Sequence, residues 1–489
     1  MTLRFDWYPR LENQDIAAKA DIVINQLIKT QTHRRTKSNI ELTTKQILNA
    51  LYCSYFSLPK GSSQVSISLT SGHYTNTEYS YRVVKDVFNC LCELKWIEFE
   101  KGNEDKKKIT RIWSVGELSL AFDAIGLLWF PQDSKPEQSL VILRDYRNPK
   151  GKTKKARGNK VDLEVPETKD VREYRSNLYK YNQFLLKHCI WLDLDDKNLN
   201  KLANEIIKRL KDENRVWSTE QDEKVGCLDI SRVQLRRIFS RGSLQQGGRF
   251  YGGWWQSIPS LYRPHIKIDT YPTVEKDYSS MALRIIYALE GIDVGENADL
   301  YDIGLPDWKS EIDPRRKPIK KYINAILNDE FDNYRLGNDD QKITGIGHKG
   351  LYEMVYKRHE AIAHLFNTGI GLKAQFIDSQ IAEEVLLAMM YQDIPVLPIH
   401  DSFIVRTGYA FLLHEEMRKA FKKIVNTNVG ITTDETRANE HFGLPKEEAQ
   451  GKPKIVKFGS EEAWEAFTKQ TTQPMIMDKY IGSWRQLDN

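Results

Sequence analysis

The stretch PTVEKDYSSMALR, residues 272–284, decides the fold of the larger part of this chain. Its first half has the character of a β-strand, and its second half opens a helix that carries Leu283 and, further on, Ile285 and Ile286. Asp277 lies where the strand ends, an edge at which many α/β folds bind ions and substrates. A lone aspartate there is more often a turn or cap residue, so a site requires a second group.

A second stretch, IPVLPIHDSFIV, residues 394–405, supplies that group. Residues 394–399 read as a strand that delivers His400 and Asp401, and residues 402–405 as its hairpin partner. Two aspartates brought together from distant strands can hold two divalent cations about 3.5–4 Å apart for phosphoryl transfer. Asp277 and Asp401 are therefore the candidate catalytic residues.

A helix between these strands carries polar residues at intervals of four. They form a gently spiralling stripe about 18 Å long, made up of Arg316, Lys320, Asn324 and Asn328. Because Pro318 lies between the two cations, the helix is expected to begin near Lys317 or to be kinked. A solvent-exposed basic helix start is the alternative interpretation.

Together these segments resemble the palm and fingers of family A DNA polymerases and single-subunit, phage-type RNA polymerases, over about residues 228–430. Asp277-Tyr278-Ser279 with Leu283-Arg284 is similar to the DNA-polymerase form of the first catalytic motif. His400-Asp401-Ser402-Phe403 is similar to the RNA-polymerase form of the last. The resemblance implies an α+β fold, a right-hand polymerase with an antiparallel palm sheet and helical fingers and thumb.

The resemblance also implies roles for individual residues. Asp277, Asp401 and the main-chain carbonyl of Tyr278 would bind two Mg²⁺ ions, with Mn²⁺ as a substitute. Lys320 would protonate the departing pyrophosphate. The implied nucleotide contacts are Arg316, Lys320, Asn324, Asn328 and Ala282, and the implied nucleic-acid contacts are Arg249, Gln256, Arg284 and His400. Arg249 and Gln256 belong to a segment that resembles the one following the minor groove of the primer-template, where sequence-independent acceptors lie.

The chain departs from the family pattern at three positions. Asn324 and Asn328 replace an aromatic residue and a tyrosine, and Ala282 replaces the glutamate that excludes ribonucleotides. A methyl group leaves room for a 2′-hydroxyl, so we expect relaxed sugar selectivity.

Residues 1–125 are expected to form an α-rich, winged-helix-like domain. Helices are predicted at 14–33, at 43–51 behind a capping box, and at 79–95, followed by strands at 96–100 and 109–115. Such folds often place a helix in the DNA major groove. Lys85 is the main cation in the middle of the last helix and Glu93 opposes it, so DNA contact and simple packing both remain open.

The rest of the chain is divided by composition. Residues 126–227 are expected to hold a basic loop, between Arg144 and Lys160, and a helical thumb or linker. Residues 228–440 are expected to form the palm and reduced fingers, and residues 441–489 are expected to form a tail. Arg263, His265 and Lys267 alternate as if along a strand and are candidates to face phosphates.

The overall composition agrees with a folded protein that binds nucleic acid. The 489 residues are 40% hydrophobic and carry a net charge of +5. Five cysteines, an odd number without zinc-site spacing, and the lack of a signal sequence or an 18-residue apolar run predict a cytoplasmic protein without a membrane partner.

We therefore expect a template-directed nucleotidyltransferase, a compact DNA polymerase that acts on a DNA primer-template, or on RNA, with nucleoside triphosphates. No acidic exonuclease constellation precedes residue 228, so no proofreading is expected, and the architecture suits a replication protein of a mobile element. A primase-like enzyme or RNA polymerase is the alternative, favoured by Ala282 and by His400-Asp401-Ser402-Phe403. A non-catalytic DNA-binding initiator with a degenerate palm is the alternative of another class.

Overall fold

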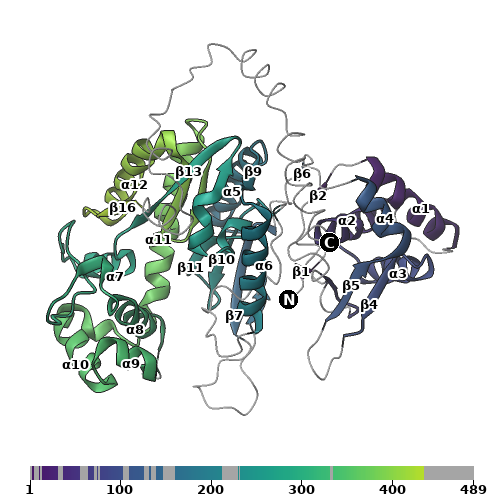
Figure 1. Ribbon diagram of the computed structural model, residues 1–489. Coiled ribbons are helices and arrows are strands. Elements are labelled where there is room, and N and C mark those ends of the chain that lie inside the picture. The colour runs from purple at the N-terminus through teal and green to yellow at the C-terminus, as the bar shows by residue number, and fades with distance from the viewer. Residues whose placement is uncertain are drawn as a thin grey trace.

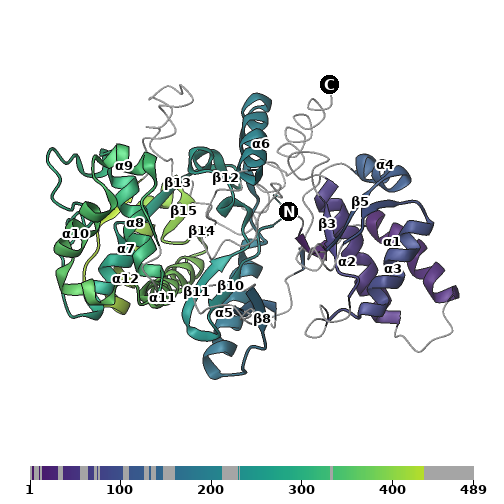
Figure 2. The same ribbon diagram turned by 90° about the horizontal axis from the view of Figure 1, so that it is seen from below.

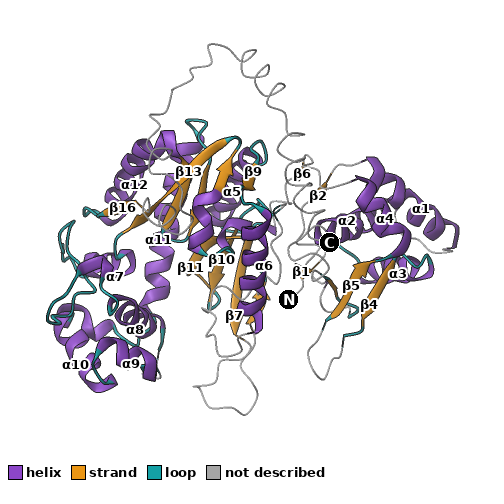
Figure 3. Ribbon diagram, viewed as in Figure 1, coloured by secondary structure: helices purple, strands orange, loops and turns teal. Residues whose placement is uncertain are grey.

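The computed structural model describes most of the chain. The described residues are 14–30, 37–55, 64–70, 78–102, 109–125, 139–146, 160–211, 232–330 and 334–433, with residues 3, 4, 10, 11, 74, 132, 133 and 230. The expected tail at 441–489 and most of the basic loop lie outside them. The described part has a mixed α and β fold with antiparallel and mixed sheets (Figure 3).

An N-terminal body holds four helices and short strands within the described residues, to the right in Figure 1. Its elements are β1 (Leu3–Arg4), β2 (Arg10–Leu11), α1 (Gln14–Thr30), α2 (Lys37–Tyr55), β3 (Val65–Ile67), α3 (Tyr81–Glu93), β4 (Ile97–Glu100), β5 (Thr110–Ser114), α4 (Gly116–Ile125) and β6 (Gln132–Asp133). The apolar faces of these helices pack into a core of their own, separate from the core of the rest of the chain.

The predicted order of helices followed by a hairpin is confirmed for α1, α3, β4 and β5. The predicted short helix at 43–51 is wrong in extent, because α2 begins at Lys37 and continues to Tyr55. Thr43 and Thr44 are buried in its middle and form no capping box. The exposed residues of β4 include Glu98 and Glu100, so this strand presents acidic side chains where a DNA-binding wing would be basic.

The larger body is built on two sheets. A mixed sheet has the order β11-β10-β7-β8, with β10 parallel to β7. The other sheet has the order β14-β15-β13-β12-β9, with β16 also paired to β13, and all its pairings are antiparallel. The strands are β7 (Val141–Tyr146), β8 (Lys160–Leu163), β9 (Ile190–Leu192), β10 (Arg236–Ser240), β11 (Ser243–Tyr251), β12 (Ile266–Ile268), β13 (Tyr271–Tyr278), β14 (Val396–Ile399), β15 (Ser402–Arg406) and β16 (Ile431–Thr433).

The helices of the larger body surround these sheets. They are α5 (Lys169–Leu185), α6 (Asp196–Lys211), α7 (Met281–Leu289), α8 (Arg316–Asn328), α9 (Asn338–Thr344), α10 (His348–Arg358), α11 (Ile370–Met390) and α12 (Ala410–Val425). Helices α7 to α10 gather in one lobe beside the antiparallel sheet in both views (Figures 1 and 2). No described helix is both long and apolar enough to span a membrane.

Within the region 126–227, expected to be a loop and helical linker, residues 139–146 and 160–211 are part of this body. Strands β7 and β8 extend the mixed sheet, and β9 pairs with β12. Asn182 of α5 accepts from the main-chain N–H of Leu235 and donates to its carbonyl, at 2.8 and 3.0 Å. The expected boundary at residue 227 therefore does not separate two cores.

Candidate functional site

The antiparallel sheet brings the two predicted aspartates to adjacent strand ends. Asp277 of β13 lies opposite Ser402, the first residue of β15. Ile399 pairs with Ser402, so His400 and Asp401 form a two-residue turn between β14 and β15. The main-chain N–H of Tyr278 donates to the carbonyl of Asp401 at 3.2 Å. These contacts confirm the predicted strands and hairpin and fix the two carboxylates as neighbours.

Both aspartates lie close to residues in the left-handed region of backbone space. His400 has a φ of 57° at the first position of its turn, where glycine is the usual choice. Ser280, just before α7, has a φ of 50°. A non-glycine residue in this region costs roughly 1–3 kcal/mol, and such residues concentrate at functional sites. The backbone is thus held in an unfavourable conformation directly before Asp401 and three residues after Asp277.

Asp277 is the most perturbed group of the site. Its Oδ1 atom is buried and has no hydrogen-bond partner among the described residues. Burial, followed by the charge of Asp401, raises the pKa of Asp277 well above its ordinary value, while Lys320 and Arg263 act in the opposite direction. Two neighbouring carboxylates of this kind repel each other, and a bound cation would relieve the repulsion.

The donor set fits a hard divalent cation. Carboxylate oxygens are ligands that Mg²⁺ prefers, and it commonly binds through one or two carboxylates plus water and substrate phosphates. The part of the chain that the structure describes holds no group of three or more His, Cys, Asp and Glu residues that could bind a metal. Asp277 and Asp401 would therefore be the protein's side-chain ligands. The side chain of Tyr278 is directed into the core, where its hydroxyl donates to the Met417 carbonyl at 2.6 Å, so that only its main chain could contribute.

Glu275, which the sequence analysis did not single out, lies two residues before Asp277 on the same strand. Its Oε1 accepts from Arg263 Nη1 at 2.9 Å and from Ser402 Oγ at 2.5 Å. Residues two apart on a strand share a face, so the spacing of Glu275 and Asp277 in the sequence already predicts that both side chains lie on the same side of the sheet. The two contacts use one oxygen of Glu275 and tie β13 to the 3₁₀ helix that carries Arg263 and to the start of β15.

Helix α8 presents its polar stripe on the side opposite its buried face. Arg316, Lys320, Asn324 and Asn328 are all partly exposed, whereas residues such as Ile319 and Ile323 are fully buried. The helix begins at Arg316, so that Pro318 falls in its first turn, where a missing N–H removes no helical hydrogen bond. The start is thus one residue earlier than expected.

Two of the four stripe residues remain candidates for contact with phosphates. Lys320 lies close enough to Asp277 to lower its pKa, and Arg316 lies beside it on the ring of Tyr301. Asn328 is engaged inside the protein: its Nδ2 donates to the Asn324 carbonyl at 2.8 Å and its Oδ1 accepts from Gln375 at 3.1 Å. Ala282 lies partly exposed in the first turn of α7.

Two predicted nucleic-acid contacts instead have roles inside the protein. The buried Arg284 guanidinium donates to the carbonyls of Ser279, Gly295, Glu296 and Ala298 at 2.5–2.9 Å. Gln256 donates to the carbonyls of Phe250 and Pro398 and accepts from Gly252 N–H. Both side chains hold loops in place. The sequence pattern shows that they are polar but does not show the main-chain carbonyls that surround them.

The other two predicted nucleic-acid contacts lie near the hairpin. Arg249 of β11 donates from Nε to Asp378 of α11, at 2.5 Å. The ring of His400 contacts that of Tyr251, and burial, followed by the charge of Arg249, lowers the pKa of His400 to about 3. His400 is therefore neutral at physiological pH and could recognise a partner through a hydrogen bond but not as a cation.

The expected alternation of Arg263, His265 and Lys267 along one strand is wrong. A 3₁₀ helix covers Ser260–His265, and β12 begins only at Ile266. Arg263 is consequently directed at Glu275 rather than in line with Lys267.

Comparisons with known proteins add little to this geometry. No family model and no curated protein matches the chain. Among solved structures, the POL domain of Pol1 from M. smegmatis, in complex with DNA primer-template and dNTP, is similar at 12% identity and a TM-score of 0.30. The match covers 48% of this chain and 51% of that one, so the chain spans about half the length of this neighbour. A likeness of that size carries no conclusion about fold or function, which must come from the site itself.

Proposed function

We propose that this protein is a template-directed nucleotidyltransferase. The observation that carries the proposal is the register of β13 and β15, which sets Asp277 beside Asp401, with the Lys320 and Arg316 side chains of α8 nearby. A carboxylate pair that faces cations suits a reaction in which a triphosphate is positioned and its leaving group stabilised.

In the proposed reaction Asp277 and Asp401 would hold two Mg²⁺ ions, which would supply Lewis-acid activation of a 3′-hydroxyl and of the phosphoryl group. Arg316 and Lys320 would bind the triphosphate of the incoming nucleotide. Lys320 would also donate a proton to the departing pyrophosphate. Asn324 and Ala282 would border the base and sugar, while Asn328 would act through its contacts with α11.

We further propose that the enzyme belongs to the family A-like branch, as a compact right-hand DNA polymerase without proofreading that extends a DNA primer on its template. The small side chain of Ala282, partly exposed at the start of α7, supports the second candidate, synthesis with ribonucleotides by a primase-like enzyme or RNA polymerase. A methyl group there does not fill the space next to a ribose 2′-hydroxyl.

Primer extension with Mg²⁺ tests both levels of the proposal. The assay would compare wild type, Asp401→Ala and the control Asp339→Ala, whose exposed carboxylate forms an ion pair with the exposed Lys342. We expect Asp401→Ala to reduce synthesis roughly 1,000-fold or more and Asp339→Ala to leave it unchanged. Parallel reactions with dNTPs and rNTPs, on DNA and RNA templates, separate the two candidates.

Two results would contradict the proposal. DNA binding by the wild type without any synthesis would favour a non-catalytic binding protein. Synthesis that persists in Asp401→Ala would place the reaction elsewhere. Rejection of rNTPs by several orders of magnitude would contradict relaxed sugar selectivity alone.

A further inference from the structure

The loop between α7 and α8 places an aromatic ring in the candidate site. Tyr301 is only 3% exposed. The guanidinium carbon of Arg316 lies 4.7 Å from the centroid of this ring, and Nζ of Lys320 lies 5.7 Å from the same centroid. One ring thus receives both cations of the stripe, as cation–π contacts.

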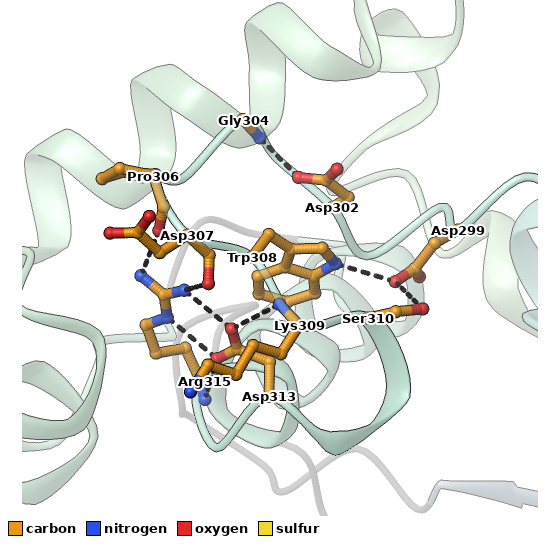
Figure 4. Close-up of polar contacts among 10 residues, drawn as sticks. All are labelled: Asp299, Asp302, Gly304, Pro306, Asp307, Trp308, Lys309, Ser310, Asp313 and Arg315. Carbon is orange, nitrogen blue, oxygen red and sulfur yellow. Dashed lines mark hydrogen bonds and ion pairs between the residues drawn. The ribbon is translucent and has the colours of Figure 1, made fainter.

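Contacts within the loop fix the position of this ring. The Oδ1 atom of Asp299 accepts from the main-chain N–H of Tyr301 at 3.1 Å and lies 3.7 Å from Arg316. The other oxygen of Asp299 accepts from Trp308 Nε1 at 3.0 Å and from Ser310 at 3.5 Å (Figure 4). Contacts within the loop therefore position Tyr301 without a bound ligand.

The end of the same loop is equally well anchored. Arg315 donates to the carboxylate of Asp313 at 2.7 and 2.8 Å and to the carbonyls of Pro306 and Asp307 (Figure 4). Arg315 directly precedes α8, so these bonds also set where Arg316 begins the helix.

Tyr301 lies within electrostatic reach of the carboxylate pair as well. Burial is the main cause that raises its pKa, followed by the charge of Asp401, with a smaller effect of Asp277. Yet neither Arg316 nor Lys320 forms an ion pair with Asp277 or Asp401 in the described structure. Arg316 pairs with Asp299 instead. Opposite charges in a partly buried site attract strongly, so direct pairing of Lys320 with a carboxylate is expected unless another contact holds it.

We propose that Tyr301 is a positioning residue that holds Arg316 and Lys320 on its ring and keeps Lys320 from pairing with Asp277 and Asp401. The carboxylates then stay available to divalent cations, and the cations stay available to a polyphosphate. This inference rests on the proposed function for the identity of its ligands. Tyr301, which lies outside the sequence motifs, would thus keep the carboxylates free to bind metal.

Binding of Mn²⁺ to the full-length protein without nucleotide, followed by electron paramagnetic resonance, tests the inference. Tyr301→Leu removes the ring, so Lys320 should pair with the carboxylates and the affinity for Mn²⁺ should fall about tenfold. Tyr301→Phe keeps the ring and should bind as wild type. Tyr287→Leu is the matched control, because Tyr287 is another buried tyrosine whose hydroxyl contacts His359 instead of the site.

If Tyr301→Leu does not fold, phenylalanine with increasing numbers of fluorine atoms at position 301 replaces it. Fluorination weakens the negative face of the ring at nearly constant shape, so the affinity should fall stepwise. Unchanged Mn²⁺ binding in Tyr301→Leu or in the fluorinated series would overturn the inference, as would an equal loss in Tyr287→Leu or in Tyr301→Phe.

The same measurement separates this inference from the proposed function. Mn²⁺ binding that depends on Asp401 and on the ring at position 301, in a protein that extends no primer, would support the inference and contradict the proposed function. Wild-type protein that binds no Mn²⁺ in an Asp401-dependent manner would contradict both.

Discussion

Two groups of charged residues in the larger body are treated differently by the fold. Where α11 packs on β10 and β11, the buried Arg237 pairs with Glu383 at 2.6 Å and Arg249 pairs with Asp378. In the candidate site, Asp277 Oδ1 and Arg316 Nε are buried without a hydrogen-bond partner among the described residues. Unsatisfied buried polar groups are costly, and a ligand bound at the site would supply these two atoms with partners.

The largest effect that we expect in this comparison is at the paired group. Arg237→Met would leave Glu383 without its cationic partner, with only the Asn177 amide as a donor, and would remove the donors to Ser379 and to the Gly248 carbonyl. We expect the free energy of unfolding to fall by about 3–5 kcal/mol. Urea unfolding measures it, with Arg418→Met as the control, since Arg418 forms only an exposed pair with Glu415. A change below about 1 kcal/mol would show that the pair is not structural.

A smaller effect is expected at the cation of the candidate site. Lys320→Ala removes the proposed proton donor, and we expect kcat to fall about 100-fold, equivalent to about 2.7 kcal/mol. Its neighbour Lys321 is exposed and paired with Asp340, so Lys321→Ala should change kcat little. Steady-state nucleotide incorporation provides the measurement. Equal effects of the two substitutions would show that Lys320 is part of a solvent-exposed basic helix face without a catalytic role.

The smallest effect has the opposite sign to that of Arg237→Met. Because the folded protein raises the pKa of Asp277, the ionised carboxylate destabilises it at neutral pH. Asp277→Asn should therefore abolish synthesis but raise Tm in EDTA by ~2 °C, about 1 kcal/mol for a body of this size. The gain should shrink on acidification, since Asp277 becomes protonated and its charge penalty disappears. A lower Tm for Asp277→Asn at neutral pH would contradict the idea that this charge lacks a partner.

The local elements around the site could be predicted because their patterns are short-range. Strand β13 ends at Tyr278, one residue after Asp277, and His400–Asp401 falls in the predicted turn. Helix α8 is predicted from the polar residues at intervals of four that begin at Arg316. Its early start reflects a rule about first turns, in which proline is tolerated.

The partners of polar side chains could not be predicted in this way. Arg284 has the same chemistry as Arg316, yet its donors are used by the Ser279 carbonyl and by three carbonyls of the following loop. Arg316 instead contacts a ring. Gln256 likewise reads as a polar group in a motif, but it meets the carbonyl of Pro398 from a strand far along the chain. Long-range proximity decides which polar group is consumed inside the protein.

By itself, the sequence determined the strands and helices that carry Asp277, Asp401, Arg316 and Lys320, because periodicity and turn chemistry act over a few residues. Only the tertiary structure decided which of these groups lie side by side and which contacts hold them. The antiparallel register set the two carboxylates side by side, and the loop from Asp299 to Arg315 placed the ring of Tyr301 against the cations. The physical reason is that electrostatic and hydrogen-bond energies depend on distances in space, which no local pattern specifies.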